Sequence, residues 1–259
     1  MTDLLVSVRD DCEFRTALAA GVAIIDFKEP SRGALAAVEP AIWRSAVKRL
    51  AAPLGDQLDG APSPRGRSRL SAALGEPHDW RAVIGRLPAG FQFAKIGPSG
   101  IETAADLKRL WHEAARHLGP TTELVAVAYA DFEAAHCLSP AAIFQLASEA
   151  GFQRGLVDTF TKDGRSTLDH LTAAGLRELG QIASRASMQW AIAGSLRLAM
   201  VDELETEGVH PDCYAVRGDL CEQDRTGNQC PRRLKQWGDR VALLSGQRSS
   251  LFAPRKLRK

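Results

Sequence analysis

Short apolar runs alternate along the chain with longer segments in which apolar residues recur every three or four positions. The short runs predict buried strands, and the longer segments predict amphipathic helices. The apolar runs are residues 4–8, 22–28, 70–75, 91–97, 124–131, 155–161, 189–195 and 213–218. The helical segments follow them at residues 11–20, 40–52, 78–86, 102–118, 139–150, 168–186, 197–207 and 230–244.

Regular alternation of strand and helix is typical of a parallel sheet built from βα units. Eight such units in 259 residues match a closed barrel, which needs about 250. We therefore predict an α/β fold with a single (β/α)8 barrel over residues 1–246, followed by a basic C-terminal tail at 247–259. Because the loops after the strands build the active site of such a barrel, residues 219–229 are expected at that end and residues 54–68 at the opposite end.

Charged residues stand where several of the apolar runs end. Asp26 and Lys28 close the second run, Lys95 the fourth, and Asp158 and Lys162 the sixth. Side chains two positions apart share one side of a strand, so Asp26 and Lys28 are predicted to point the same way, and Asp158 and Lys162 also do if their strand continues that far. These groups either form a reactive cluster at the mouth of the barrel or are ion pairs that close it.

Lysines in such a cluster carry a specific chemistry. An amine near other cations and apolar walls has a lowered pKa and acts as a nucleophile or a base near neutral pH. This favours a Schiff base with a carbonyl substrate, while the carboxylates and the other lysines move protons. That chemistry needs neither a metal nor a cofactor, although Asp26, Asp131 and Asp158 leave a magnesium site as a minor alternative.

The seventh and eighth runs end in Gly194-Ser195 and Arg217-Gly218. Barrel enzymes often bind a phosphate on backbone N–H groups at this position, so we predict a small phosphorylated substrate. The alternative is that the glycines only permit tight turns.

The composition limits the classes of partner that we expect for this protein. Thirty-three basic and 31 acidic residues give a net charge of +2, too balanced for a protein whose main partner is nucleic acid. Five cysteines without a C-x-x-C pair fit neither a disulfide framework nor a closed zinc site, and favour a cytoplasmic protein. No apolar run approaches the roughly 18 residues of a membrane span, so no membrane partner is expected. A homo-oligomer stays possible.

Several motifs together resemble one family. They are Leu-Leu-Val-Ser at 4–7, Gly-Val-Ala-Ile-Ile-Asp-Phe-Lys-Glu-Pro at 21–30, Lys-Ile-Gly at 95–97, Tyr-Ala-Asp at 129–131, Val-Asp-Thr-Phe-Thr-Lys-Asp-Gly at 157–164, Ala-Gly-Ser-Leu at 193–196, and Val-Arg-Gly at 216–218 with Cys221, Asp224 and Arg225. With these residues the chain resembles the (5-formylfuran-3-yl)methyl phosphate synthases, also called 4-HFC-P synthases, of methanofuran biosynthesis. This family of barrel enzymes joins two molecules of glyceraldehyde 3-phosphate, with loss of phosphate and water, into a phosphorylated furan aldehyde.

The resemblance implies that Lys28 forms the Schiff base and that Lys95 is the proton acceptor, with Asp26, Asp158 and Lys162 as further active-site groups. Analogy with barrel aldolases, which commonly carry the Schiff-base lysine on the sixth strand, favours Lys162 instead. Both lysines therefore stay candidates.

Three features depart from the family pattern. They are a Gly75-Glu76 pair where Gly-Asp is expected, the Pro- and Arg-rich segment 60–69, and the extension after residue 246. None removes a catalytic lysine. Two other functions stay open, namely another class I aldolase or isomerase acting on sugar phosphates, and a non-catalytic barrel that binds a phosphorylated metabolite.

Overall fold

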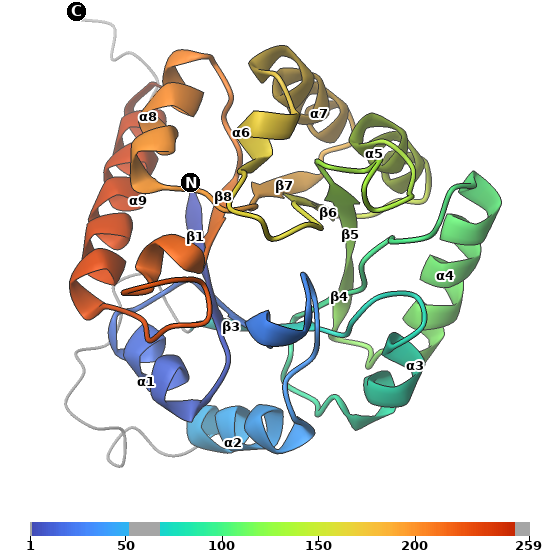
Figure 1. The fold of residues 1–259 in the computed structure, drawn as a ribbon, viewed down its shortest axis with the longest axis horizontal. Coiled ribbons are helices and arrows are strands. Elements are labelled where there is room, and N and C mark those ends of the chain that lie inside the picture. Colours follow the sequence, from blue (N-terminus) through green and yellow to red (C-terminus); the bar gives the residue numbers. More distant parts are fainter. Residues whose placement is uncertain (1, 52–67, 252–259) are drawn as a thin grey trace, which may run out of the picture.

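Eight parallel strands close into a barrel in the computed structural model, which describes residues 2–51 and 68–251 (Figure 1). Each strand pairs with the next in chain order, and β1 pairs with β8, with Leu5 opposite Ile24 and Val6 opposite Val216. The strands are β1 Asp3–Val8, β2 Ile24–Phe27, β3 Arg69–Ala73, β4 Phe93–Lys95, β5 Glu123–Tyr129, β6 Arg154–Asp158, β7 Gln189–Ile192 and β8 Cys213–Val216. The predicted (β/α)8 barrel is confirmed.

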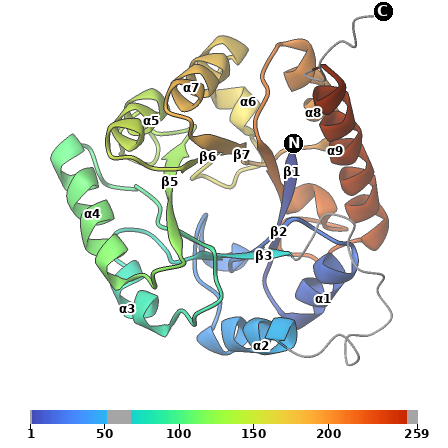
Figure 2. The ribbon, with the colours of Figure 1, turned by 180° about the vertical axis from the view of Figure 1, so that it is seen from behind.

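Helices surround the barrel on its outside, as Figure 2 shows from behind. They are α1 Asp11–Ala19, α2 Pro40–Ala51, α3 Trp80–Val83, α4 Ala104–His117, α5 Pro140–Glu149, α6 Thr167–His170, α7 Ala173–Arg185, α8 Leu198–Thr206 and α9 Pro231–Leu251. Short 3₁₀ helices lie in the connections of the described ranges, at η1 Pro30–Arg32, η3 Ile84–Arg86 and η4 Gly218–Leu220. None of the helices in the described ranges combines the length and apolar character that crossing a membrane requires.

Two predicted helices are each split in the structure. The segment 78–86 becomes α3 followed by η3, because Gly85 weakens the helix and Leu87, which precedes Pro88, takes an extended conformation. The segment 168–186 becomes α6 and α7, because Thr172 caps a new helix by accepting a hydrogen bond from the Gly175 N–H. The outer layer is therefore less regular than the sequence pattern predicts.

Several strands end earlier than the apolar runs predicted. Strand β6 ends at Asp158 rather than at Thr161, because the N–H groups of Phe160 and Thr161 donate to the Asp131 carboxylate at 2.6 and 2.7 Å instead of continuing the ladder. The connections at this end of the barrel consequently begin within the segments that carry the predicted site residues.

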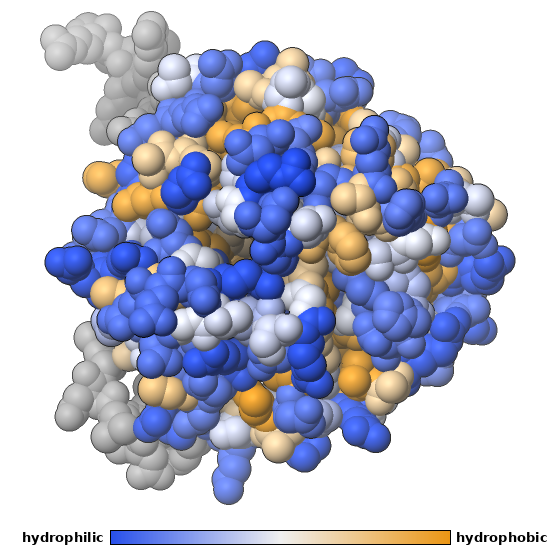
Figure 3. Space-filling model, in the orientation of Figure 1, coloured by the Kyte–Doolittle hydropathy of each residue, from blue (hydrophilic) through white to orange (hydrophobic). Residues whose placement is uncertain are grey.

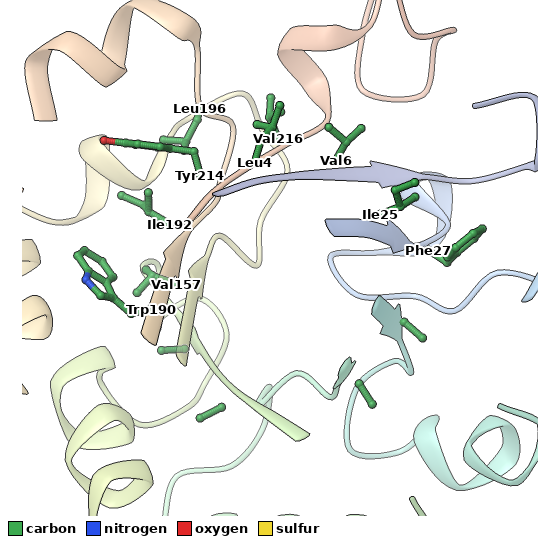
Figure 4. Close-up of a cluster of buried hydrophobic side chains, with 14 of the residues drawn as sticks. Leu4, Val6, Ile25, Phe27, Val157, Trp190, Ile192, Leu196, Tyr214 and Val216 are labelled. Carbon is green, nitrogen blue, oxygen red and sulfur yellow. The ribbon is translucent and has the colours of Figure 1, made fainter. Parts of the chain in front are cut away.

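Buried side chains form two layers that follow the strand period of two. One layer lies inside the barrel and includes Leu5, Phe93 and Leu156. The other lies between the strands and the helices, and Figure 4 shows part of it, including Val6 and Ile25. Because inward and outward positions alternate, each inward position is fixed once the register is fixed.

The ends of the chain are only partly described. The Ser245 hydroxyl accepts a hydrogen bond from the Thr2 N–H at 3.0 Å and donates one to the Thr2 carbonyl at 2.8 Å, which ties α9 to the entry of β1. Residues 252–259 lie outside the described residues, as does nearly all of the segment 54–68. Residues 247–251 of the predicted tail at 247–259 continue α9. The rest of the tail, and the placement of 54–68 away from the active site, stay predictions.

Candidate active site

A cavity of about 490 Å³ opens at the carboxyl ends of the strands. Figure 1 looks onto this end, and Figure 3 shows hydrophilic residues over the middle of the same face. Every residue predicted for the site lines the cavity: Asp26, Lys28, Lys95, Asp158, Lys162, Gly194, Ser195, Arg217 and Gly218. The structure therefore brings the predicted lysines, carboxylates and glycines together in one place.

Polarity changes along the inward-facing positions of the strands. In β2, Ile24 belongs to the apolar interior layer, whereas Asp26 and then Lys28 face the cavity above it. In β4 the change is from Phe93 to Lys95. The apolar lower layers thus act as a floor, and the charged groups stand on it in a buried environment.

Lys95 and Asp26 form a buried ion pair. Lys95 Nζ lies 2.6 Å from Asp26 Oδ1, and both side chains are at most 4% exposed. The second carboxylate oxygen, Oδ2, accepts a hydrogen bond of 3.1 Å from the Ser7 hydroxyl. The pair joins β2 to β4, with Ser7 of β1 fixing the orientation of the carboxylate.

Asp158 stands between the other two lysines. Its Oδ1 accepts a hydrogen bond of 2.9 Å from Lys162 Nζ, and its Oδ2 lies 3.7 Å from Lys28 Nζ. Burial alone would raise the pKa of this carboxyl, but the two ammonium groups and the hydrogen bonds from Lys162 and the Thr159 N–H outweigh it and hold the pKa well below its usual range. Asp158 is therefore an anion that stabilises positive charge on either lysine.

Lys162 reaches this cluster from a turn rather than from a strand. The prediction that β6 would continue toward it is wrong, yet Lys162 and Asp158 do meet, because the Asp131 carboxylate holds the intervening turn by two backbone N–H groups. Lys162 Nζ also donates to the Thr159 hydroxyl at 3.1 Å. Asp131 is thus a positioning residue for the lysine.

The Lys28 amine has a strongly lowered pKa. Burial lowers its pKa from 10.5 to about 8; the Asp158 carboxylate opposes this shift, and the nearby Lys162 ammonium adds to it. A lysine in this state supplies free amine near neutral pH. That is the property a Schiff-base nucleophile requires.

The turn after β7 has a backbone that only a small set of residues tolerates. Gly194 and Ser195 both have positive φ, 85° and 50°. A Cβ added to Gly194 would lie 2.2 Å from the Thr167 hydroxyl oxygen and 2.9 Å from Thr159 Cγ2. Within the described residues, the N–H groups of Gly194, Ser195 and Gly218 donate to no other residue, which leaves them available to an anion in the cavity.

Arg217 lines the cavity, but protein groups already hold its guanidinium. Nη1 and Nη2 donate to the Glu13 carboxylate at 2.6 and 3.1 Å, Nη1 also donates to the Ser7 carbonyl at 3.0 Å, and Nε donates to the Arg225 carbonyl at 2.7 Å. At 5% exposure the guanidinium is a buried support for the loop after β8.

Sequence reasoning missed several residues around the site. Glu13, in the first turn of α1, neutralises Arg217, and no local signal links positions 204 residues apart. Glu76, which stands where the family pattern has Asp, accepts a hydrogen bond from the Tyr129 hydroxyl. Burial and the Glu76 carboxylate raise the pKa of Tyr129 well above its ordinary value.

The three aspartates considered for magnesium do not form a cluster. In the parts of the chain that the structure describes, no group of three His, Cys, Asp or Glu side chains has the arrangement of a metal site. Asp26 and Asp158 instead pair with lysines, and Asp131 binds backbone N–H groups.

Comparison with known proteins decides the family. The model of the 4-HFC-P synthase family matches residues 4–238. The chain belongs to the 4-HFC-P synthase family. The (5-formylfuran-3-yl)methyl phosphate synthase of Methanosarcina mazei is 32% identical over 232 residues, which cover 86% of this chain and 92% of that protein. The enzyme of the same name from Methanococcus maripaludis is 30% identical over 240 residues, 89% and 95% of the two chains.

The fold is also found among solved structures. N-(5'-phosphoribosyl)anthranilate isomerase from Pyrococcus furiosus superimposes with a TM-score of 0.55 at 14% identity, covering 94% of this chain and all of that one. At that identity the likeness shows the barrel fold only. The resemblance drawn from the motifs is confirmed, and with it the prediction of an enzyme of the 4-HFC-P synthase family.

Proposed function

We propose that this protein condenses two molecules of glyceraldehyde 3-phosphate through an imine on Lys28, with loss of phosphate and water, to give (5-formylfuran-3-yl)methyl phosphate for a methanofuran-type cofactor. One observation carries the proposal: a buried amine with a pKa of about 8 stands in a polar cavity beside two further lysines and two carboxylates. The reaction named for the relatives agrees with this arrangement.

The first step uses Lys28. Its neutral Nζ attacks the aldehyde carbon of one triose phosphate, and the hydroxyl group of the adduct takes a proton from solvent and leaves as water, which gives a protonated imine. The positive imine nitrogen stays beside Asp158, whose carboxylate is 3.7 Å from Lys28 Nζ and stabilises it. This imine acidifies the neighbouring carbon of the substrate.

The second step uses Lys95. Once its proton has passed to Asp26 or to the substrate, Lys95 accepts the proton from the acidified carbon, and the electron pair expels phosphate from the third carbon of this triose. That third carbon, now the end of an enol, bonds to the ketone carbon of the second triose, which has been converted from aldehyde to ketone by proton transfer between its first two carbons. Lys162 donates a proton to the alkoxide that forms. The primary hydroxyl of the second triose then closes the ring on the carbon next to the imine, and two molecules of water leave. Hydrolysis of the imine releases the furan aldehyde and regenerates the Lys28 amine.

A phosphate position completes the site. We place one phosphate group of the substrates on the N–H groups of Gly194, Ser195 and Gly218, next to Arg217, because these donors face the cavity without a protein acceptor among the described residues. The protein needs no metal or cofactor for these steps. A small phosphorylated substrate and a cytoplasmic location are parts of the same proposal.

Geometry favours Lys28 over Lys162 as the nucleophile. Lys162 Nζ donates hydrogen bonds to Asp158 at 2.9 Å and to Thr159 at 3.1 Å, so its donors are engaged with the protein, whereas Lys28 Nζ lies 3.7 Å from its carboxylate. Burial also acts directly on the Lys28 amine. Lys162 is therefore assigned to proton transfer.

The test is mass spectrometry of the protein after incubation with glyceraldehyde 3-phosphate and borohydride, with ultraviolet absorbance of the unreduced reaction followed for a conjugated furan aldehyde. We expect a reduced adduct on Lys28 together with growing absorbance. In Lys28→Arg the charge persists but no adduct forms, and Lys162→Arg is the matched variant that keeps the adduct. An adduct on Lys162 without furan would indicate an ordinary aldolase, and the absence of both would indicate a binding barrel.

A further inference from the structure

Arg225 is a half-buried cation of the cavity wall that has no ion-pair partner in the described part of the chain. Among the residues that the structure describes, its guanidinium makes a single hydrogen bond, from Nη2 to the Gly33 carbonyl at 3.0 Å. Gly33 follows β2, five residues after Lys28 along the chain. The Arg225 side chain thus reaches from the loop after β8 to the side of the cavity where Lys28 stands.

The carboxylates near Arg225 have other partners. Asp224 accepts hydrogen bonds from the N–H and hydroxyl of Thr226, at 2.7 and 2.5 Å. Asp158 pairs with Lys162 and Lys28, and Glu29 accepts hydrogen bonds from the N–H and hydroxyl of Ser31, at 2.9 and 2.6 Å. Within the described residues, no carboxylate is therefore left to pair with Arg225, and its charge is available to an anion that enters the cavity.

The backbone that carries Arg225 is held firmly. Its carbonyl accepts a hydrogen bond from Arg217 Nε at 2.7 Å, and Arg217 is itself fixed by Glu13. The same loop is closed by an antiparallel bridge between Cys221 and Gln229, and the Gln229 amide donates to the Ser7 carbonyl at 2.7 Å. These contacts fix the backbone that carries Arg225, which lowers the cost of ordering the loop when an anion binds.

A partly buried guanidinium on the wall of a polar cavity is suited to bind phosphate. It stays charged when partly buried, and its planar set of donors matches the oxygens of a phosphate. Burial removes part of the hydration of a charged group, which is unfavourable without a counter-ion. An anion that pairs with the guanidinium compensates for this loss and is therefore bound more strongly. Apart from the hydrogen bond to the Gly33 carbonyl, the N–H donors of the guanidinium have no acceptor among the described residues, so they are available to such an anion.

We propose that Arg225 binds the phosphate of the second triose, so that the cavity holds two phosphate monoesters at once, one on the backbone after β7 and β8 and one on Arg225 beside Lys28. This rests on the proposed function, because only a condensation of two phosphorylated substrates needs both positions. A simple aldolase that acts on one phosphate would need only the first.

Titration calorimetry with inorganic phosphate tests the two positions without any turnover. We expect the wild-type protein and Arg32→Gln to bind two phosphates, and Arg225→Gln to bind one. Arg32 is the matched control because it is an exposed arginine beside Gly33 that pairs with Glu39 and does not line the cavity. Equal stoichiometry in Arg225→Gln and the wild type would overturn the assignment, even if the protein forms no imine.

Kinetic measurements then distinguish binding of the first triose from binding of the second. In Arg225→Gln, borohydride trapping of the Lys28 adduct should be unchanged, while KM for furan formation rises about 10- to 100-fold, in line with the loss of a charged hydrogen bond. Arg225→Lys should recover only part of this loss, because a point charge lacks the fork. If trapping and turnover fall together, Arg225 serves the first triose or the fold, and the proposal is wrong; if the wild type itself traps no adduct, the proposed function fails instead.

Discussion

At the scale of single residues, the function depends on how burial changes the protonation of an amine. Lysine has an ordinary pKa of 10.5, at which about one amine in three thousand is free at pH 7; a pKa of about 8 raises this to about one in ten. The carboxylate of Asp158 limits the shift, and the Lys162 ammonium adds to it. Burial, Asp158 and Lys162 thus act together on the fraction of Lys28 that is present as free amine.

This argument predicts the pH dependence of the reaction. The neutral amine is the nucleophile, so kcat/KM for furan formation should rise about tenfold per pH unit below pH 8 and level off above it, because Lys28 loses its proton through a pKa of about 8. The measurement is the initial rate of absorbance increase across pH 6.5 to about 9.5. A profile that is flat across pH 8 would contradict Lys28 as the nucleophile.

Replacing Lys162 by Met should move that profile. Two effects act in the same direction: a neighbouring positive charge that lowers the Lys28 pKa is removed, and Asp158 is left to pair with Lys28 alone. The pKa of Lys28 therefore rises, and the limb of the pH profile shifts to higher pH, as seen in the rate of adduct trapping. Lys108→Met, an exposed lysine paired with Glu149, is the control that should leave the limb in place.

At the scale of elements, the turns after the strands matter more than the strands. Strand periodicity placed Asp26 and Lys28 on one side of β2, and the structure confirms this. The same reasoning failed beyond Asp158, because the side chain of Asp131, from the neighbouring strand's end, captures the N–H groups that a longer β6 would have used. A contact between different elements decides that turn, and no local pattern reports it.

The turn after β7 allows a test of crowding at a glycine. Gly194→Ala should destabilise the protein by about 1–3 kcal/mol or more, because the added methyl meets Thr167 and Thr159 at a positive φ. Gly164→Ala is the control, since its φ is 94° but nothing lies within 4 Å of the added Cβ. Urea denaturation of both variants is the measurement, and equal losses would show that crowding at Gly194 is unimportant.

At the scale of the whole molecule, the barrel holds charged groups in its interior at a cost in stability. The folded protein keeps Lys28 at a pKa of about 8 while the unfolded chain has 10.5. Between these values the unfolded chain binds a proton that the folded protein does not, so stability rises with pH in that window and the cost is fully present below it. Function and stability therefore oppose each other at this residue.

A comparison of the wild type with Lys28→Met measures that cost. The free energy of unfolding of the wild type, minus that of the variant, should increase by about 3 kcal/mol as the pH rises from about 8 to about 10.5. Taking the difference cancels the titration of Tyr129 and of the cysteines, which both proteins share. Denaturant unfolding across this range is the experiment, and a difference independent of pH would mean that Lys28 has an ordinary pKa in the folded protein.

The sequence by itself determined the eight βα units, the side of β2 on which Asp26 and Lys28 lie, and the family motifs, because each depends on a period or on residues that are close along the chain. Only the tertiary structure decided that Glu13 neutralises Arg217, that Asp131 positions Lys162, and that Arg225 reaches Gly33 with no carboxylate partner among the described residues. These contacts join residues up to 204 positions apart, and closure of the barrel is what brings them within hydrogen-bond distance. The pKa of Lys28 belongs to the same group, since burial and the charges of other strands set it.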